Sequence, residues 1–221
     1  MQAEFWHQRW QAGEIGFHKH EYNAHMTRFI DLLGIEPGDN VLVPLCGKSL
    51  DMIWLRDQNF HVTGIEISPI AVTDFYAENK IEYEISEHTW GKAYRSKHLD
   101  ILCADFFDIS PADLPHTDGI YDRASLIALP EAMRPAYAKH LAGLMPDTSR
   151  SLLITLDYPQ QEMDGPPFSV SEYDVNQLFS ELFMIEPIYS EDCLVNEPRF
   201  QEKGLSRLDE RVFLLTKNIP Y

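Results

Sequence analysis

Residues 41–52, VLVPLCGKSLDM, decide the fold class, because a short apolar run gives way here to a helix-like pattern through a single glycine, Gly47. A Walker phosphate-binding loop requires another glycine five residues earlier, where this chain has Leu42. A dinucleotide fingerprint requires three closely spaced glycines, yet Gly47 is the only glycine between Gly38 and Gly64. We therefore expect this loop to bind neither a nucleoside triphosphate nor a pyrophosphate.

The position of the loop indicates a different nucleotide pocket. It follows the first predicted strand, at the carboxyl edge of an open sheet, where ligands of such folds bind. The second predicted strand ends at Glu66, nineteen residues after Gly47, near the ~20 expected for an acid that accepts from ribose hydroxyls. Spacing alone leaves two interpretations of Glu66 open: a contact to an adenosine without phosphates, or a solvated carboxylate at a strand end.

Short apolar runs alternate with helical patterns along the chain and predict an α/β fold with a mostly parallel sheet covered by helices on both faces. Five short runs rich in Val, Ile, Leu or Tyr are predicted to be strands: 40–45, 61–67, 99–105, 119–125 and 151–158. Two more strand candidates follow the crossover units: 183–190 and 210–218. The last two are expected to form an antiparallel pair at one sheet edge. Segments in which apolar residues recur every three or four positions are predicted to be helices: 4–11, 20–33, 49–58, 68–79, 135–145 and 171–182.

The chain shows no internal repeat, low-complexity tract or linker, so residues 1–221 are predicted to form one domain. Within it, residues 1–35 are expected to form an N-terminal helical cover, and residues 158–168 are a candidate active-site loop. Pro69, directly after Ser68, is expected at the first position of a helix that Ser68 caps.

The composition excludes several classes of protein. Lys+Arg 18 against Asp+Glu 35 gives a formal net charge of -17, which opposes phosphate neutralisation and argues against a nucleic-acid partner. We also expect no membrane partner and no secretory leader, since no apolar run is long enough and the N-terminus lacks the leader pattern. The three scattered cysteines suit reduced thiols and a cytoplasmic location, and the acidic surface favours a monomer.

Two further clusters could carry chemistry. A nucleophilic cysteine needs a neighbouring base, and no histidine pairs with Cys46 in the local sequence, so a loop or core cysteine is favoured. His18, His20 and His25 lack the spacing of a known metal site. No bound metal is expected.

Several motifs together resemble the bacterial branch of the thiopurine S-methyltransferase family over essentially the whole chain. They are Trp6-x-x-x-Trp10 with Phe17-His18, Pro44-Leu45-Cys46-Gly47-Lys48-Ser49-x-Asp51-Met52, Gly64-Ile65-Glu66-Ile67-Ser68, Tyr121-Asp122-Arg123-Ala124-Ser125-Leu126, and Gly165-Pro166-Pro167-Phe168. The resemblance implies a class I methyltransferase (Rossmann-like) fold with a seven-stranded, mostly parallel sheet. It also implies transfer of a methyl group from S-adenosylmethionine, without metal, to the sulfur of thiopurines or other aromatic or heterocyclic thiols, with S-adenosylhomocysteine as product.

The resemblance assigns site residues by motif. Around the cofactor it places Trp10, Leu45, Gly47, Glu66, Asp105, Phe106 and Arg123. In this assignment Glu66 holds the ribose hydroxyls, and Arg123 lies between cofactor and acceptor as the catalytic residue. Around the acceptor it places Phe17, Phe168 and Arg199. Two alternative functions remain: methylation of selenium or tellurium compounds, and a non-catalytic adenosine-binding scaffold.

The residues themselves leave some of these roles open. Trp6 and Trp10 lie one helical turn apart, which by periodicity favours packing on the core. Phe106 and Phe107 are adjacent, so at most one of them points into a pocket. Arg123 lies among apolar residues and needs a partner, which is either a ligand or a carboxylate. Because no His/carboxylate pair is evident, cations are expected to favour the thiolate of the acceptor.

Overall fold

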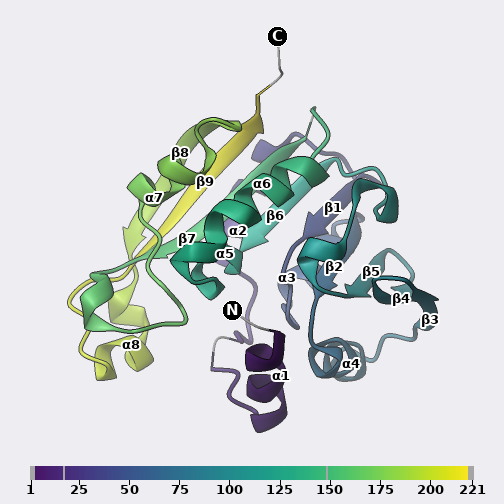
Figure 1. Cartoon of the computed structure of the whole chain (residues 1–221), viewed down its shortest axis with the longest axis horizontal. Helices are drawn as coiled ribbons and strands as arrows, with labels where there is room; N and C mark the ends of the chain where they lie inside the picture. The colour runs from purple at the N-terminus through teal and green to yellow at the C-terminus, as the bar shows by residue number, and fades with distance from the viewer. Residues whose placement is uncertain (1–2, 17, 148, 219–221) are drawn as a thin grey trace. The chain divides into compact units, whose positions relative to one another are not determined.

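A computed structural model (Figure 1) describes residues 3–16, 18–147 and 149–218. The chain divides into two compact units, Met1–Tyr121 and Asp122–Tyr221. The expectation of one domain over residues 1–221 stays a prediction. Within the described part of the chain, no helix has the length and apolar character needed to cross a membrane.

The first unit is built on six strands. They are β1 (Asn40–Val43), β2 (His61–Glu66), β3 (Glu84–His88), β4 (Gly91–Ser96), β5 (Leu99–Cys103) and β6 (Gly119–Arg123), which runs two residues past the unit boundary. They are ordered β3-β4-β5-β2-β1-β6. The four strands β5, β2, β1 and β6 pair in parallel, whereas β3 and β4 pair antiparallel.

Burial explains why the central strands are continuous apolar runs. Val41, Leu42 and Val43 are all buried, as parallel strands covered on both faces require. In register, Val43 lies beside Gly64 of β2, and Glu66 lies beside Cys103 of β5. The ends of β1, β2 and β5, where the predicted cofactor residues follow, therefore lie side by side.

The helices of the first unit begin largely where the sequence indicates. They are α1 (Ala3–Ala12), α2 (Ala24–Phe29), α3 (Asp51–Asp57) and α4 (Pro69–Glu78), with 3-10 turns η1 (Ile30–Leu33), η2 (Phe106–Asp108) and η3 (Pro111–Asp113). The prediction for Pro69 is confirmed: Ser68 is the N-cap of α4, and its side chain accepts from Ala71 N. The predicted helix over 20–33 begins only at Ala24, because Asn23 caps it.

The second unit contains an antiparallel sheet. Its strands are β7 (Arg150–Asp157), β8 (Phe183–Asp192) and β9 (Asp209–Lys217), ordered β7-β9-β8. The predicted antiparallel pairing of the last two strands is confirmed. Its helices are α5 (Ser125–Ala128), α6 (Arg134–Leu144), α7 (Glu172–Phe179) and α8 (Pro198–Glu202), with η4 (Glu131–Met133), η5 (Gln160–Glu162) and η6 (Leu194–Asn196).

All seven predicted strands are present, and the hairpin of β3 and β4 is additional. The sequence of β3, EISEH, gives no apolar run, because four of its five residues are exposed and the fifth is only partly buried. A strand that buries little carries no hydrophobic pattern, so β3 could not be predicted in this way.

Candidate functional site

The loop after β1 is a tight turn fixed to the neighbouring strand. Leu45 and Gly47 both have positive φ, 47° and 53°, and a positive φ is uncommon for leucine. Cys46 N donates to Ile65 O at 2.9 Å, and Ser49 N donates to Cys46 O at 3.1 Å. These bonds hold the turn beside the end of β2.

Glu66 joins this turn to the start of α4. One carboxylate oxygen accepts from Gly47 N at 2.9 Å, and the other accepts from Ser68 N at 2.7 Å. Burial raises the pKa of Glu66, and the N–H donors of Ser68 and Gly47 offset part of that effect. Each oxygen has further acceptor capacity, so this fixed, buried carboxylate can still accept from hydroxyl groups of a ligand.

Helix α1 lies over the same turn. Trp10 is buried, and a Cβ placed on Gly47 would lie 3.4 Å from its indole ring. His7 Nε2 lies 3.1 Å from Ile67 O, just beyond β2. Figure 1 shows α1 and α4 at the same end of the first unit, where they contact each other. Trp10 is therefore buried, as its periodicity indicates, and it is buried against the loop predicted to bind the cofactor.

Lys48 has a partner within the protein. It is 7% exposed, and its Nζ lies 2.5 Å from Glu78 Oε1 at the end of α4. A buried ammonium group needs such a partner. The interpretation that Gly-Lys-Ser here is not a phosphate-binding sequence agrees with this ion pair, which links the turn to α4.

Asp51, at the start of α3, is a buried acid with a structural role that the sequence did not reveal. Its two carboxylate oxygens accept from Asn23 N at 2.8 Å and from Tyr121 Oη at 2.9 Å. It therefore connects the beginnings of α2 and α3 to β6. A single aspartate in a helical pattern gives no sequence signal for such a role.

Cys46 is a core residue. Burial raises the pKa of its thiol well above the ordinary value, and the charge of Glu66 adds to the effect. A thiol held in its neutral form is a poor nucleophile, which supports the structural interpretation. A Cβ on Gly64 would lie 2.7 Å from Cys46 Sγ and 3.0 Å from Met52 Sδ, so the glycine in β2 makes room for the cysteine in the turn.

This packing makes Gly64→Ala a strongly destabilising change. We expect it to lower the free energy of unfolding by about 1–3 kcal/mol, the usual effect of overpacking a core, measured by chemical denaturation. The double variant Gly64→Ala/Cys46→Ala removes the clashing sulfur and should recover part of the loss. Gly143→Ala in α6, where a Cβ meets nothing within 4 Å, is the matched control. Equal stability of Gly64→Ala and Gly143→Ala would contradict the packing argument.

The segment after β5 contains one buried and one partly buried aromatic ring. Asp105 caps η2, with Oδ1 accepting from Phe107 N at 3.0 Å. Phe106 is 4% exposed, whereas Phe107 is only partly buried. The expectation that at most one of the two rings points into a pocket stays a prediction. The adenine contacts assigned to Asp105 and Phe106 stay predictions.

In the second unit, Arg123 lies at the end of β6, and Ala124 follows with φ 70°. The preceding Asp122 is fully buried and accepts from Tyr137 Oη at 2.7 Å. Burial raises the pKa of Asp122 to about 6, against the opposing hydrogen bonds from Ser125 and Tyr137. Whether the partner of Arg123 is a ligand or a carboxylate stays open.

The predicted active-site loop fixes Phe168 tightly. Phe168 N donates to Ile127 O at 2.7 Å. A Cβ on Gly165, which has φ +76°, would lie 2.5 Å from the Phe168 ring. Tyr158 Oη donates to Pro167 O at 2.6 Å. The sequence Gly-Pro-Pro-Phe is therefore a turn in which only glycine leaves room for the aromatic ring.

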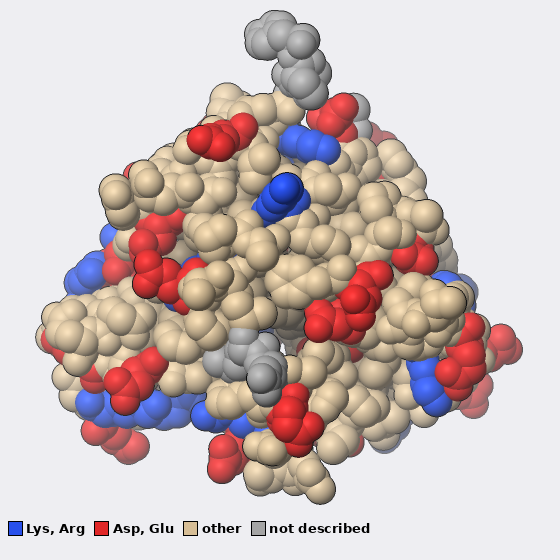
Figure 2. All heavy atoms as spheres, viewed as in Figure 1, with Lys and Arg blue, Asp and Glu red and all other residues tan. Residues whose placement is uncertain are grey.

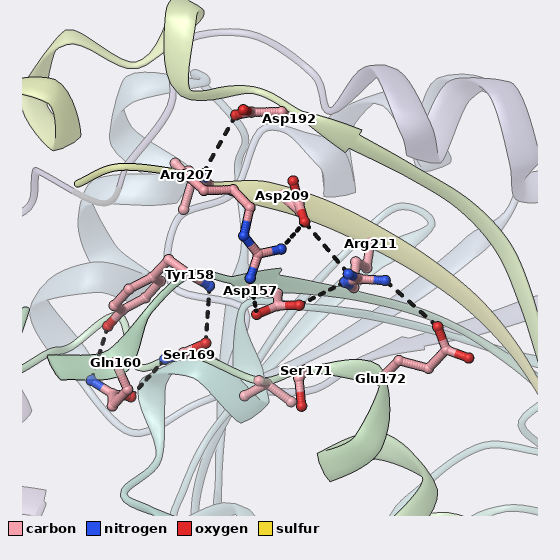
Figure 3. A network of polar contacts seen from close by, with 12 residues as sticks. Asp157, Tyr158, Gln160, Ser169, Ser171, Glu172, Asp192, Arg207, Asp209 and Arg211 are labelled. Carbon is pink, nitrogen blue, oxygen red and sulfur yellow. Dashed lines mark hydrogen bonds and ion pairs between the residues drawn. The ribbon is translucent and has the colours of Figure 1, made fainter. Parts of the chain in front are cut away.

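A network of charges anchors the start of this loop (Figure 3). Asp157, the last residue of β7, lies between two guanidinium groups, at 3.1 Å from Arg207 Nη2 and 3.0 Å from Arg211 Nε. Asp209 bonds to both arginines, and Arg211 also pairs with Glu172 of α7 at 3.5 Å. Beside the network, Tyr158 N donates to Ser169 Oγ at 3.0 Å, which joins the two ends of the loop.

The remaining predicted acceptor residues are Arg199 and Phe17. The Arg199 guanidinium lies over the ring of its neighbour Phe200, 4.8 Å from the centroid. Phe17 lies outside the described residues. In the described part of the chain, no group of three or more His, Cys, Asp or Glu residues is arranged to hold a metal ion.

The predicted residues thus divide between the units. The first unit brings together Trp10, Gly47 and Glu66 through direct contacts, and it also carries Leu45, Asp105 and Phe106. The second unit carries Arg123, Phe168 and Arg199. Residues that sequence reasoning missed are His7, Asp51 and the buried Arg134, whose contacts arise only on folding.

Comparison with known proteins gives the family. The sequence model of a family described as thiopurine S-methyltransferase matches residues 1–218. A thiopurine S-methyltransferase of Nitrosospira multiformis is 47% identical over 218 residues, covering 97% of this chain and 98% of that protein. One of Pseudomonas fluorescens is 44% identical over 217 residues and covers 98% of both.

Two solved structures that resemble this chain at low sequence identity are methyltransferases. The Burkholderia thailandensis 1,6-didemethyltoxoflavin-N1-methyltransferase, solved with 1,6-didemethyltoxoflavin and S-adenosylhomocysteine, gives a TM-score of 0.65 at 14% identity, covering 98% of this chain and 87% of that one. A Haemonchus contortus phosphoethanolamine N-methyltransferase gives 0.60 at 7% identity, and this chain spans 52% of its length while 88% of this chain is covered. The fold is that of class I S-adenosylmethionine-dependent methyltransferases, and the chain belongs to the thiopurine S-methyltransferase family.

Proposed function

We propose that this chain transfers a methyl group from S-adenosylmethionine to the sulfur of thiopurines or other heteroaromatic thiols. Family membership supports the reaction, and the observation that carries it is the buried Glu66 carboxylate, held by the amides of Gly47 and Ser68 at the carboxyl end of β2. This is where a doubly wound fold accepts a ribose.

The first unit fits the adenosine part of the cofactor. Glu66 would accept from the ribose hydroxyls. Because residue 47 is a glycine, no side chain fills the space between the turn and the Trp10 ring. When bound, S-adenosylmethionine supplies an electrophilic methyl group on its sulfonium sulfur. The leaving group is S-adenosylhomocysteine, a neutral thioether. The chain therefore has no need of a covalent intermediate.

The task left to the chain is positioning. Holding an acceptor in attack geometry can contribute about 7–11 kcal/mol to a barrier. In this proposal the Phe168 ring supports a flat acceptor, and the Arg123 guanidinium favours its thiolate over its thiol. Acidic side chains are spread over the face shown in Figure 2, so a local cation is needed to attract an anionic sulfur.

His7 is expected to assist cofactor binding by holding α1 in place. Replacing His7 by Phe removes its hydrogen bond to Ile67 O and should weaken S-adenosylmethionine binding about fivefold, the usual worth of one neutral hydrogen bond. His7→Gln keeps a donor and should retain most of the affinity. Titration calorimetry measures both, with Gln11→Phe on the exposed side of α1 as control. Equal affinities of His7→Phe and the unmodified chain would contradict this role.

The experiment that tests the function combines calorimetry with a methyl-transfer assay. The unmodified chain is titrated with S-adenosylmethionine and then assayed on thiopurines, other heteroaromatic thiols, aliphatic thiols, and selenium and tellurium compounds. Binding followed by methylation of a heteroaromatic thiol supports the proposal. Absence of cofactor binding refutes it, and binding without turnover indicates an adenosine-binding scaffold. Preferential methylation of selenium or tellurium compounds would show that these are the acceptors, with the same methyl donor.

A further inference from the structure

Arg134, the first residue of α6, is a buried cation that the site described above does not use. It is 5% exposed, and its Nε donates to Leu129 O at 3.1 Å. Within residues 3–16, 18–147 and 149–218, no carboxylate forms an ion pair with it. Burial lowers the pKa of Arg134, and the more distant charges of Asp174 and Glu131 oppose that shift. A guanidinium buried without a carboxylate partner costs stability, which points to another reason for its presence.

Its contacts connect two parts of the proposed acceptor site. The Arg134 guanidinium carbon lies 5.9 Å from the centroid of the Phe168 ring, within the range of a cation–π contact. The carbonyl that accepts from it belongs to Leu129, at the end of the short helix α5 that follows Arg123. Arg134 therefore contacts both the aromatic ring of the loop and the segment leading from the strand-end arginine.

The remaining contacts of Phe168 show what Arg134 adds. The backbone of Phe168 is fixed by Ile127 O, and one part of its ring lies against Gly165. Neither contact is directional for the plane of the ring. A planar guanidinium is directional, because it packs on an aromatic face and donates through a rigid fork. Arg134 thus adds a directional contact to the ring.

We propose that Arg134 is a positioning residue for the methyl acceptor, which orients the Phe168 ring as the wall against which flat heteroaromatic thiols are bound. The inference rests on the proposed function, and it assigns selectivity for aromatic over aliphatic acceptors to this contact. Lysine cannot substitute, since an ammonium group lacks the planar fork that packs on the ring and bonds to Leu129 O.

The test compares Arg134→Met and Arg134→Lys with the unmodified chain. For a heteroaromatic thiol, we expect Arg134→Met to lower kcat/KM about tenfold, mainly through KM, in line with loss of a buried cation–π contact. For 2-mercaptoethanol the loss should be smaller, and the affinity for S-adenosylmethionine should not change. Arg134→Lys should recover only part of the aromatic preference. Lys139→Met, which removes an exposed cation from the same helix, is the matched control.

A second readout separates positioning from a merely structural role. The chain carrying 4-fluorophenylalanine at position 168 should show a fluorine resonance that moves in Arg134→Met and in Arg134→Lys but not in Lys139→Met. Phe168→Leu should lose the same aromatic preference, and Arg134→Lys/Phe168→Leu should lose no more. A fully active chain whose aromatic-to-aliphatic ratio and fluorine signal are unchanged by both Arg134 variants overturns this inference alone. A chain that binds S-adenosylmethionine but methylates no thiol refutes the proposed function as well.

Discussion

Replacing Glu66 by Gln is expected to weaken S-adenosylmethionine binding by about 100-fold, because hydrogen bonds to a charged acceptor are worth roughly 1.5–3 kcal/mol each. The substitution removes the charge that would accept from the ribose hydroxyls. It also places an amide NH₂ group opposite the N–H of either Gly47 or Ser68, both of which donate to Glu66. The ribose contact and the turn of the first loop should therefore both be impaired.

Titration calorimetry measures this loss, and Glu186→Gln supplies the control. Glu186 is exposed on β8, so its replacement makes the same change of charge without touching the site. Thermal unfolding without ligand should show that Glu66→Gln is folded, since burial already raises the pKa of this carboxyl and a neutral amide is cheaper to bury than a carboxylate. Equal cofactor affinity of the two variants would remove Glu66 from the binding site.

The same carboxylate predicts the pH dependence of cofactor binding. Because burial raises the pKa of Glu66 above its ordinary value, the group takes up a proton at a higher pH than an exposed glutamate. Protonation removes acceptor capacity, so affinity for S-adenosylmethionine should be complete well above that pKa and fall as the pH is lowered through it. Glu66→Gln should bind weakly with no such fall.

Much of the fold could be predicted from the sequence, because the central strands are buried on both faces. An apolar run such as residues 40–45 remains recognisable in isolation, and all seven predicted strands are found. The hairpin of β3 and β4 was not predictable in this way, since β3 is exposed and carries Glu84 and Glu87. Patterns in sequence report burial, and an exposed strand gives none.

For the site, spacing alone left two interpretations of Glu66 open, a ribose contact and a solvated carboxylate. The carboxylate is buried and accepts from Gly47 N, and its contact to a ribose stays a prediction. Periodicity favoured the core for Trp10, whose ring is buried against Gly47. By contrast, nothing in the sequence PEAMRPAY marks Arg134 as buried, because its contacts to Leu129 and Phe168 require the loop after β7 to fold back. Contacts between distant segments leave no local pattern.

Replacing Arg123 by Ala is expected to lower kcat about 100-fold with a smaller effect on the KM of the acceptor, because a neighbouring cation lowers the pKa of a bound thiol by about 1–3 units and only the thiolate attacks the methyl group readily. Arg123 lies at the end of β6, directly before a residue with positive φ, so its backbone position is defined by the turn. Arg123→Lys keeps the charge and should recover part of the rate.

The proposed role of Arg123 also predicts how the rate loss in Arg123→Ala varies with the pKa of the acceptor thiol. If the guanidinium favours the thiolate, thiols with a low pKa already supply that anion and should lose little rate in Arg123→Ala, whereas thiols with a high pKa should lose the most. Steady-state kinetics over such a series measures the trend, and calorimetry with S-adenosylmethionine shows how far cofactor binding is affected. A uniform loss across the series would assign Arg123 to positioning instead of charge stabilisation, and unchanged turnover would remove it from the mechanism. The slope against thiol pKa therefore distinguishes the two ways in which one arginine at a strand end can accelerate methyl transfer to sulfur.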